Sequence, residues 1–153
     1  MDHEFEILDM APQAALAVRS KVPAADIPAK MVESFAEVWT FIAEKKALVA
    51  GPPFAMYHSW SGGEIDMEVG FPVAAAVEGG GRVQPMTLPG GKVACGLHIG
   101  PYDKLVDTYN ALTAWMKAQG HIPAGRMWEC YLSDPQIEKD PEKWMTRMYW
   151  PVE

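Results

Sequence analysis

The chain has 153 residues, of which 49% are hydrophobic and 22% charged, and this composition indicates one globular domain and excludes a disordered chain. Its formal net charge is −7 and no run of Lys or Arg occurs, so a direct nucleic-acid partner is not expected. The N-terminus lacks the basic and apolar segments of a signal peptide, and no apolar stretch reaches the roughly 20 residues that span a bilayer. We therefore expect a cytoplasmic protein with no membrane partner.

The first half of the chain predicts two strands, a helix and two further strands. The segments FEILDM (5–10) and AALAVRSKV (14–22) flank a turn at Pro12, which predicts a hairpin. A helix follows with Asp26 as its expected N-cap, because apolar residues then recur at spacings of three and four. These residues are Ile27, Met31, Phe35, Val38 and Ile42. The segments 53–60 and 64–71 predict the two closing strands.

The second half predicts the same elements in the same order. The segments 82–88 and 92–99 flank the turn PGG, which again predicts a hairpin. The next helix is expected to end at Gly120, and strands are expected at 126–132 and 144–150. The apolar positions of this helix are Tyr102, Leu105, Tyr109, Leu112 and Met116.

The two halves can be laid over each other. Gly51 falls on Gly125 and Tyr57 on Tyr131 at a shift of 74 residues. We therefore expect a single domain, 1–153, with a first repeat at about 4–77, a linker at 78–82 and a second repeat at about 82–153. The expected fold is α+β, an internal duplication of two strand–helix–strand–strand units, each read as hairpin, helix, hairpin. Its sheet would be antiparallel with one long helix per unit, and a ligand cleft would lie between the units.

The stretch HIGPY (98–102) raises the question of a catalytic histidine. His98 would need a nucleophile and an orienting acid, and the sequence shows no nucleophile motif. A helix start explains the stretch better, because Gly100 permits a sharp exit from a strand and Pro101 suits a first helical turn. Asp103 would then interact favourably with the helix dipole.

Cofactor and metal sites are not expected. The histidines at positions 3, 58, 98 and 121 lack metal-ligand spacing, and Cys95 and Cys130 have no CxxC partner, so these cysteines suit reduced core thiols. The glycine runs 79–81 and 90–91 do not join a strand to a helix as phosphate-binding loops do.

The strand RMWECYL (126–132) contains a glutamate with two interpretations. Alternation places Met127, Glu129 and Tyr131 on one face and the apolar Trp128, Cys130 and Leu132 on the other. The apolar face is expected to pack under the helices, which sends Glu129 to the opposite face. From the residues alone, an exposed surface glutamate is the ordinary interpretation.

The segment 90–120, followed by WECYLSDP and the terminal MYWPV, resembles the GyrI-like small-molecule-binding domain, as does DMEVGFPV in the first half. The resemblance covers essentially the whole chain. It implies the duplicated fold with a ligand cleft, and it implies that Glu129 lies at the bottom of an aromatic cleft. In drug-sensing relatives this glutamate meets the charge of lipophilic cations. Unlike those relatives, the chain begins its first strand by about residue 5, so no helix-turn-helix region is expected before it. We therefore expect a stand-alone binder.

Several aromatic residues are candidate walls for a site around Glu129, and for each of them a place in the core is the alternative. A flat cation could stack on their rings while its charge meets the carboxylate. Asp66 and Glu68 form a second acidic pair, for which a solvated strand face is the expected explanation. The candidate walls are Tyr57, Tyr131, Tyr102, Trp39 and Trp144.

Three functions follow as hypotheses. The first is a non-enzymatic binder of hydrophobic, cationic aromatic molecules, by multidrug-type binding or sequestration. The second is a hydrolase of strained electrophilic molecules such as cyclopropane compounds, with Glu129 as its catalytic residue. The third is a gyrase-interacting module, against which the interspersed acidic and basic residues argue. The natural ligand, the oligomeric state, any protein partner and any regulation of a transcription factor stay open.

Overall fold

The structure is a computed structural model that describes residues 5–134 and 137–153. The chain forms two compact units. We call the segment Pro12–Pro89 the α1 unit, and the residues up to Ala11 together with Gly90–Glu153 the α2 unit. The segment 78–82, expected as a linker, lies inside the α1 unit.

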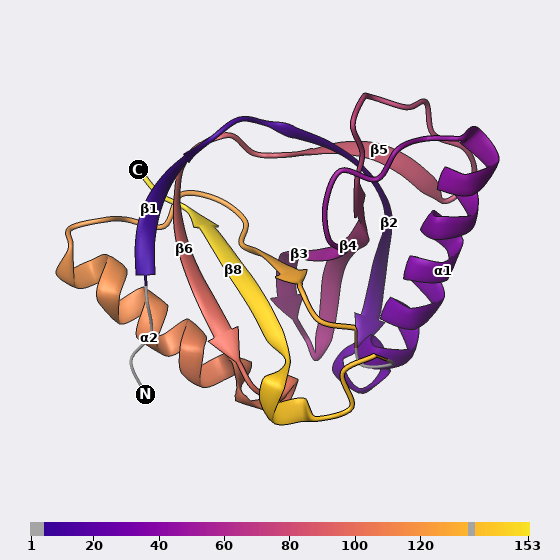
Figure 1. Cartoon of the computed structure of the whole chain (residues 1–153). Coiled ribbons are helices and arrows are strands. Elements are labelled where there is room, and N and C mark those ends of the chain that lie inside the picture. The colour runs from indigo at the N-terminus through magenta and orange to yellow at the C-terminus, as the bar shows by residue number, and fades with distance from the viewer. Residues whose placement is uncertain (1–4, 135–136) are drawn as a thin grey trace. The chain divides into compact units, whose positions relative to one another are not determined.

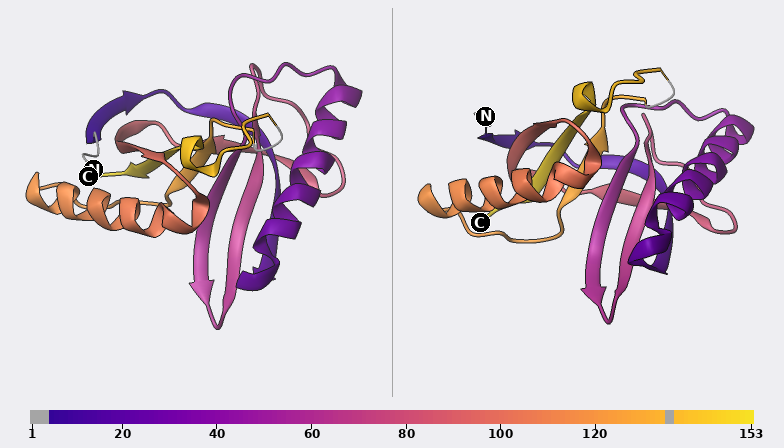
Figure 2. Two further views of the ribbon diagram at one scale, coloured as in Figure 1. Left: turned by 60° about the horizontal axis from the view of Figure 1, so that its bottom comes forward. Right: turned by 90° about the horizontal axis from the view of Figure 1, so that it is seen from below.

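The α1 unit is a four-stranded antiparallel sheet with one long helix along it (Figure 1). Its strand order is β3-β4-β2-β5, and α1 lies along β2 and β4 in both views of Figure 2. Its core forms between α1 and the sheet from Leu16, Val18, Val38, Ile42, Val73 and Val83. The elements are β2 (Gln13–Pro23), a short 3-10 helix (Ala24–Asp26), α1 (Ile27–Lys45), β3 (Phe54–Ser61), β4 (Glu64–Pro72) and β5 (Val83–Leu88).

The α2 unit has the same layering, with strand order β1-β6-β8-β7 and helix α2 beside β6. Its core contains Ala94, Leu112, Met116, Met148 and Val152. The elements are β1 (Phe5–Met10), β6 (Gly91–Ile99), a 3-10 helix (Tyr102–Lys104), α2 (Leu105–Ala118), β7 (Trp128–Tyr131), a 3-10 helix (Pro141–Lys143) and β8 (Met145–Pro151).

The α+β class and the antiparallel strands are confirmed, but both predicted opening hairpins are wrong. Strand β1 pairs with β6, and β2 pairs with β4 and β5, so the strands on either side of Pro12 do not pair with each other. A two-residue hairpin turn needs positive φ angles, and neither Ala11 nor Pro12 has one. Pro89 likewise has its φ fixed near −65° by its ring, which excludes it from such a turn.

The closing hairpins are confirmed. Strand β3 pairs with β4 across Gly62 and Gly63, whose φ angles of 61° and 81° are those of a type I′ turn. Strand β7 pairs with β8 from Trp128 opposite Tyr149 to Tyr131 opposite Thr146.

The helix boundaries agree with the sequence signals. Asp26 is the residue before α1, although its side chain makes no capping hydrogen bond. Helix α2 ends at Ala118, and Gly120 follows with φ at 78°. The α1 unit has one strand before its helix and three after it, whereas the α2 unit has two before and two after, so the predicted order of hairpin, helix, hairpin is not repeated in both. The duplication and the cleft remain predictions.

Candidate functional site

Glu129 is a buried carboxylate in β7, with only 4% of its surface exposed. The Tyr109 hydroxyl donates to Oε1 at 2.8 Å, and the Tyr131 hydroxyl donates to Oε2 at 2.6 Å. A carboxylate removed from water is costly unless donors satisfy it. Phenol hydroxyls satisfy its oxygens without cancelling its charge, because the donors themselves are neutral. The site therefore holds a carboxylate between two phenol hydroxyls inside the α2 unit.

Glu129 lies on the sheet face that α2 covers. It is opposite Met148, which packs with Leu112 in the α2 core, and its donor Tyr109 belongs to α2. The prediction that Trp128, Cys130 and Leu132 pack under the helix is therefore wrong. Trp128 stacks on Tyr149 on the opposite face, with ring centroids 5.1 Å apart and planes 17° apart. The alternation of side chains along β7 is as predicted. The more polar face was expected to point away from the helix, but it lies under α2, because tyrosine hydroxyls make that side locally polar.

Three half-buried aromatic rings form a cluster in the α2 unit, and one of them, Tyr131, bonds this carboxylate. The ring centroid of Tyr102 lies 4.9 Å from that of Trp144 and 5.8 Å from that of Tyr131. The Trp144 indole is held by its Nε1–H, which donates to the Glu138 carbonyl at 2.8 Å. Burial raises the pKa of Tyr102, and the negative charges of Glu129 and Asp134 raise it further. Tyr102, Tyr131 and Trp144 thus form a cluster of half-buried aromatic rings close to acidic side chains.

The other two candidate walls belong to the α1 unit. Tyr57 is half-buried in β3 opposite Met67, and Trp39 is 56% exposed on α1. The Trp39 ring contacts Phe71, with centroids 5.5 Å apart. The structure therefore brings together Glu129, Tyr131, Tyr102 and Trp144, whereas a role for Tyr57 and Trp39 in the same site remains a prediction.

Tyr109 is the site residue that sequence reasoning missed, because its position in the apolar repeat of α2 marked it as core. Its ring does pack on Trp150, with centroids 6.5 Å apart. Its hydroxyl, however, reaches Glu129. The signal that could have revealed it is the need of a strand glutamate, once buried, for donors from the covering helix.

Replacing Tyr109 with phenylalanine is expected to lower the free energy of unfolding by about 1.5–3 kcal/mol, the range for a hydrogen bond to a charged group. The ring contacts survive in this variant, so the loss measures the hydroxyl donor alone. Urea unfolding of both proteins measures it. An unchanged unfolding midpoint would mean that the hydroxyl contributes nothing to holding the carboxylate.

His98 is buried and both of its ring nitrogens are bonded within the α2 unit. Nε2 lies 3.0 Å from the Pro101 carbonyl, which only accepts, so Nε2 carries the proton and donates. Nδ1 lies 2.7 Å from the Thr108 hydroxyl oxygen, within hydrogen-bond distance. Gly100 follows with φ at 135°, and its N–H donates to the Trp144 carbonyl at 2.8 Å. These contacts favour the architectural interpretation of HIGPY, in which His98 ties the strand end to α2.

Replacing His98 with alanine is expected to destabilise the protein by about 1–3 kcal/mol, because it leaves a buried hydroxyl and a carbonyl without their partner. Thermal unfolding and a binding titration, measured together, separate the two interpretations of His98. A stable variant that has lost a chemical activity would instead make His98 catalytic.

The cysteines and histidines do not form a metal site in the part of the chain described. No cluster of three metal-ligating side chains occurs among those residues. Cys95 and Cys130 are buried free thiols. Burial raises the pKa of the Cys95 thiol, and burial together with the neighbouring Cys95 raises that of Cys130 to about 12. A raised pKa leaves a thiol mostly protonated at neutral pH, so neither cysteine has the lowered pKa of a reactive thiol. His3 lies outside the described residues.

The second acidic pair is paired with bases rather than simply solvated. Arg19 donates to both Asp66 oxygens at 3.0 Å, and this hydrogen-bonded guanidinium lowers the pKa of Asp66. Glu68 Oε1 lies 2.5 Å from His58 Nε2. These contacts explain both carboxylates without a ligand.

The α2 unit thus places a buried glutamate beside half-buried aromatic rings in an α+β domain. The family model for the GyrI-like small molecule binding domain matches residues 3–153. The chain belongs to this family. A search of curated protein sequences finds no match.

Solved structures of the same fold are similar at low sequence identity. The C-terminal domain of EcmrR superposes with a TM-score of 0.88 and 20% identity over 100% of this chain and 99% of that one. In the EcmrR–DNA complex the TM-score is 0.85 at 20% identity, and the match covers 99% of this chain and 57% of the EcmrR chain.

Two further similar structures are described in different ways, one as a hydrolase and the other with a bound small molecule. A hydrolase from Listeria innocua has a TM-score of 0.70 and 17% identity over 98% of this chain and 92% of its own. SAV2435 bound to tetraphenylphosphonium has a TM-score of 0.64 and 11% identity over 98% of this chain and 94% of its own. At these identities the similarities establish the fold alone.

No helix in the described residues is long and apolar enough to cross a membrane.

Proposed function

We propose that the protein binds hydrophobic, cationic aromatic small molecules, as a multidrug-type binder or a sequestering protein, at the site around Glu129. The observation that carries the proposal is the burial of this carboxylate, held by the Tyr109 and Tyr131 hydroxyls, beside half-exposed aromatic rings. A carboxylate is negatively charged when ionised, so a cation is the ligand that complements it.

The aromatic rings supply the second part of the recognition. A delocalised cation loses little hydration on binding and gains cation–π and stacking contacts with Tyr102, Tyr131 and Trp144. These contacts depend on area and charge rather than on a fixed pattern of hydrogen bonds. The site would therefore accept ligands of different shapes, provided that they are flat or apolar and positively charged. Tyr57 and Trp39 are proposed as further walls.

The comparisons support this ligand class by analogy. SAV2435, which has the same fold, is described with bound tetraphenylphosphonium, a lipophilic cation. EcmrR carries a similar domain in a complex with DNA. For this chain the net charge of −7 argues against direct DNA binding. Its two free buried cysteines suit a reducing compartment, and we place it in the cytoplasm.

A hydrolase is the second candidate function. A similar structure is described as a hydrolase, and a buried carboxylate that accepts hydrogen bonds from two tyrosines could act as a general acid or base. The substrate class would be strained, electrophilic molecules such as cyclopropane compounds. Glu129 would be the catalytic residue in that case, and Tyr109 and Tyr131 would position it.

A thermal-shift screen with product analysis separates the two candidates. Tetraphenylphosphonium, a rhodamine dye and a reactive cyclopropane compound are each incubated with the protein, and the compounds are then analysed by mass spectrometry. A binder raises the melting temperature with the cations and returns every compound unchanged. Conversion of the cyclopropane compound that is lost in Glu129→Gln would establish the hydrolase. A labelled DNA duplex at physiological salt serves as a control, for which no binding is expected.

A further inference from the structure

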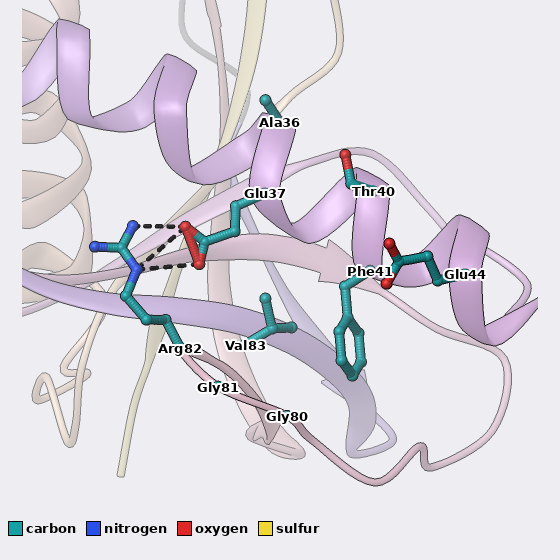
Figure 3. Close-up of a pocket in the computed structure, with 9 residues that line it drawn as sticks. All are labelled: Ala36, Glu37, Thr40, Phe41, Glu44, Gly80, Gly81, Arg82 and Val83. Atoms are coloured by element: carbon teal, nitrogen blue, oxygen red, sulfur yellow. Dashed lines mark hydrogen bonds and ion pairs between the residues drawn. The ribbon is translucent and has the colours of Figure 1, made fainter.

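The α1 unit contains a hollow of about 450 Å³ that lies outside the Glu129 site. Helix α1 forms one wall and the segment 80–83 forms the other (Figure 3). Phe41 points from α1 toward this segment, and a Cβ placed on Gly80 would lie 3.1 Å from the Phe41 ring. A glycine here therefore lets the backbone approach the ring. The lining residues are Ala36, Glu37, Thr40, Phe41, Glu44, Gly80, Gly81, Arg82 and Val83.

One end of the hollow is closed by an ion pair. Arg82 Nε lies 3.1 and 3.0 Å from the two carboxylate oxygens of Glu37, and Arg82 Nη2 lies 2.6 Å from Oε1 (Figure 3). Arg82 also reaches Glu33 at 3.3 Å. The pKa of Glu37 is lowered by this hydrogen-bonded guanidinium. The pair fixes the segment 80–83 against α1 and uses the charge of Arg82, so this arginine does not offer the hollow a free positive charge.

The aromatic ring of the hollow already carries a cation. Lys45 Nζ lies over the Phe41 ring, 5.6 Å from its centroid. Lys45 is exposed and follows Phe41 by four residues on α1, a spacing at which helical side chains are neighbours. Glu44, also exposed, lines the same hollow with its carboxylate. A ring that attracts a cation and a neighbouring carboxylate are the two parts of an ammonium-binding site.

We propose that this hollow is a second small-molecule site, for compact organic monocations that join one aromatic ring to an ammonium group. The ammonium group pairs with Glu44 and the Phe41 ring, and the apolar body lies on Val83 and on the backbone of Gly80 and Gly81. Lys45 is the tethered competitor that occupies the ring when no ligand is bound. The site lies wholly within the α1 unit and does not depend on the function proposed for Glu129.

The volume limits the ligand. A hollow of about 450 Å³ lies within the range for small-molecule sites, and its single aromatic ring, Phe41, matches a ligand that also has one ring. The probe chosen is 2-phenylethylammonium, and the neutral control is 2-phenylethanol, which has a similar shape without the charge.

The experiment is an NMR titration of the isotopically labelled full chain with the two probes. The backbone amides of Gly80, Gly81 and Thr40 are expected to shift with the ammonium probe, and the neutral alcohol is expected to bind more weakly. The same shifts are expected in Glu129→Gln, so a failure of the Glu129 proposal and a failure of this one are distinguishable. Absence of amide shifts up to millimolar probe, or equal affinity for the alcohol, would overturn the proposal.

Substitutions in the hollow are expected to change the affinity for the ammonium probe in opposite directions. Lys45→Met removes the competing cation and is expected to tighten probe binding about two- to five-fold, whereas Phe41→Leu and Glu44→Gln are each expected to weaken it by a similar factor. Lys30→Met is the matched control: it removes the same charge from the same helix, but Lys30 pairs with Glu33 outside the hollow. Equal effects of Lys45→Met and Lys30→Met would show a general charge effect and contradict the proposal.

Discussion

Replacing Glu129 with glutamine is expected to weaken the binding of tetraphenylphosphonium by about one to two orders of magnitude. The variant keeps the shape of the side chain and removes its charge. An interaction with a charged group is worth about 1.5–3 kcal/mol, and each ~1.4 kcal/mol corresponds to a factor of ten in affinity. One tyrosine hydroxyl can keep donating to the amide oxygen while the other rotates to accept from the amide NH2, so folding is expected to be retained or slightly improved.

Isothermal titration calorimetry of both proteins measures this effect, with a melting curve of each protein alone. The neutral molecule triphenylphosphine oxide is the control ligand, and its affinity is expected to change far less because its ring contacts survive. Equal affinities of the two proteins for the cation would contradict the role given to Glu129. A large fall in melting temperature would make the glutamate structural instead.

Replacing Leu112 with alanine is expected to lower the free energy of unfolding by about 2–5 kcal/mol, the range for deleting a buried leucine side chain. Leu112 is 0% exposed and packs between α2 and the sheet with Met116 and Met148. The same contacts hold the face on which Glu129 lies, since Met148 is opposite Glu129 in the sheet. The loss would be a large fraction of the stability of an ordinary domain.

Val106→Ala on the same helix is the matched control, because Val106 is 59% exposed. Its expected effect is within about 0.5 kcal/mol, as for most surface substitutions. Chemical denaturation of the three proteins gives both values. If the two variants lost similar stability, α2 would not cover the sheet as the structure shows.

The sequence was sufficient to predict the elements that local patterns define. The apolar repeat from Ile27 to Ile42 matches α1, and the signals near Asp26 and Gly120 match the ends of the helices. The closing strands were also predicted, because adjacent strands with glycine between them, as at Gly62 and Gly63, form hairpins from local geometry alone.

Strand pairing between distant segments was not predictable in the same way. The pattern of FEILDM shows a strand but not its partner, and β1 pairs with β6, more than 80 residues away in the chain. A proline between two strands was taken as a hairpin signal, although Pro12 gives no positive φ angle. Pairings of this kind depend on which sheet edge is free once the rest has folded, and local sequence patterns do not show this.

The candidate site was predicted in part, and the reason differs between residues. Glu129 was singled out through a family resemblance, because a glutamate in an alternating strand is by itself most simply a surface residue. The polarity of the two faces of β7 predicted that its apolar face would pack against α2, and the opposite face does. Polarity alone does not show that Tyr109 and Tyr131 satisfy a buried carboxylate there. The grouping of Tyr102 with Trp144 needed the structure, because it joins a helix start to the residue before β8.

The most direct test of the proposed function is a crystal structure of the protein with tetraphenylphosphonium bound. We expect the phosphonium to lie nearer to the Glu129 carboxylate than to any other carboxylate, with its phenyl rings against Tyr102, Tyr131 and Trp144. A cation bound elsewhere, with the Glu129 site unchanged and empty, would contradict it.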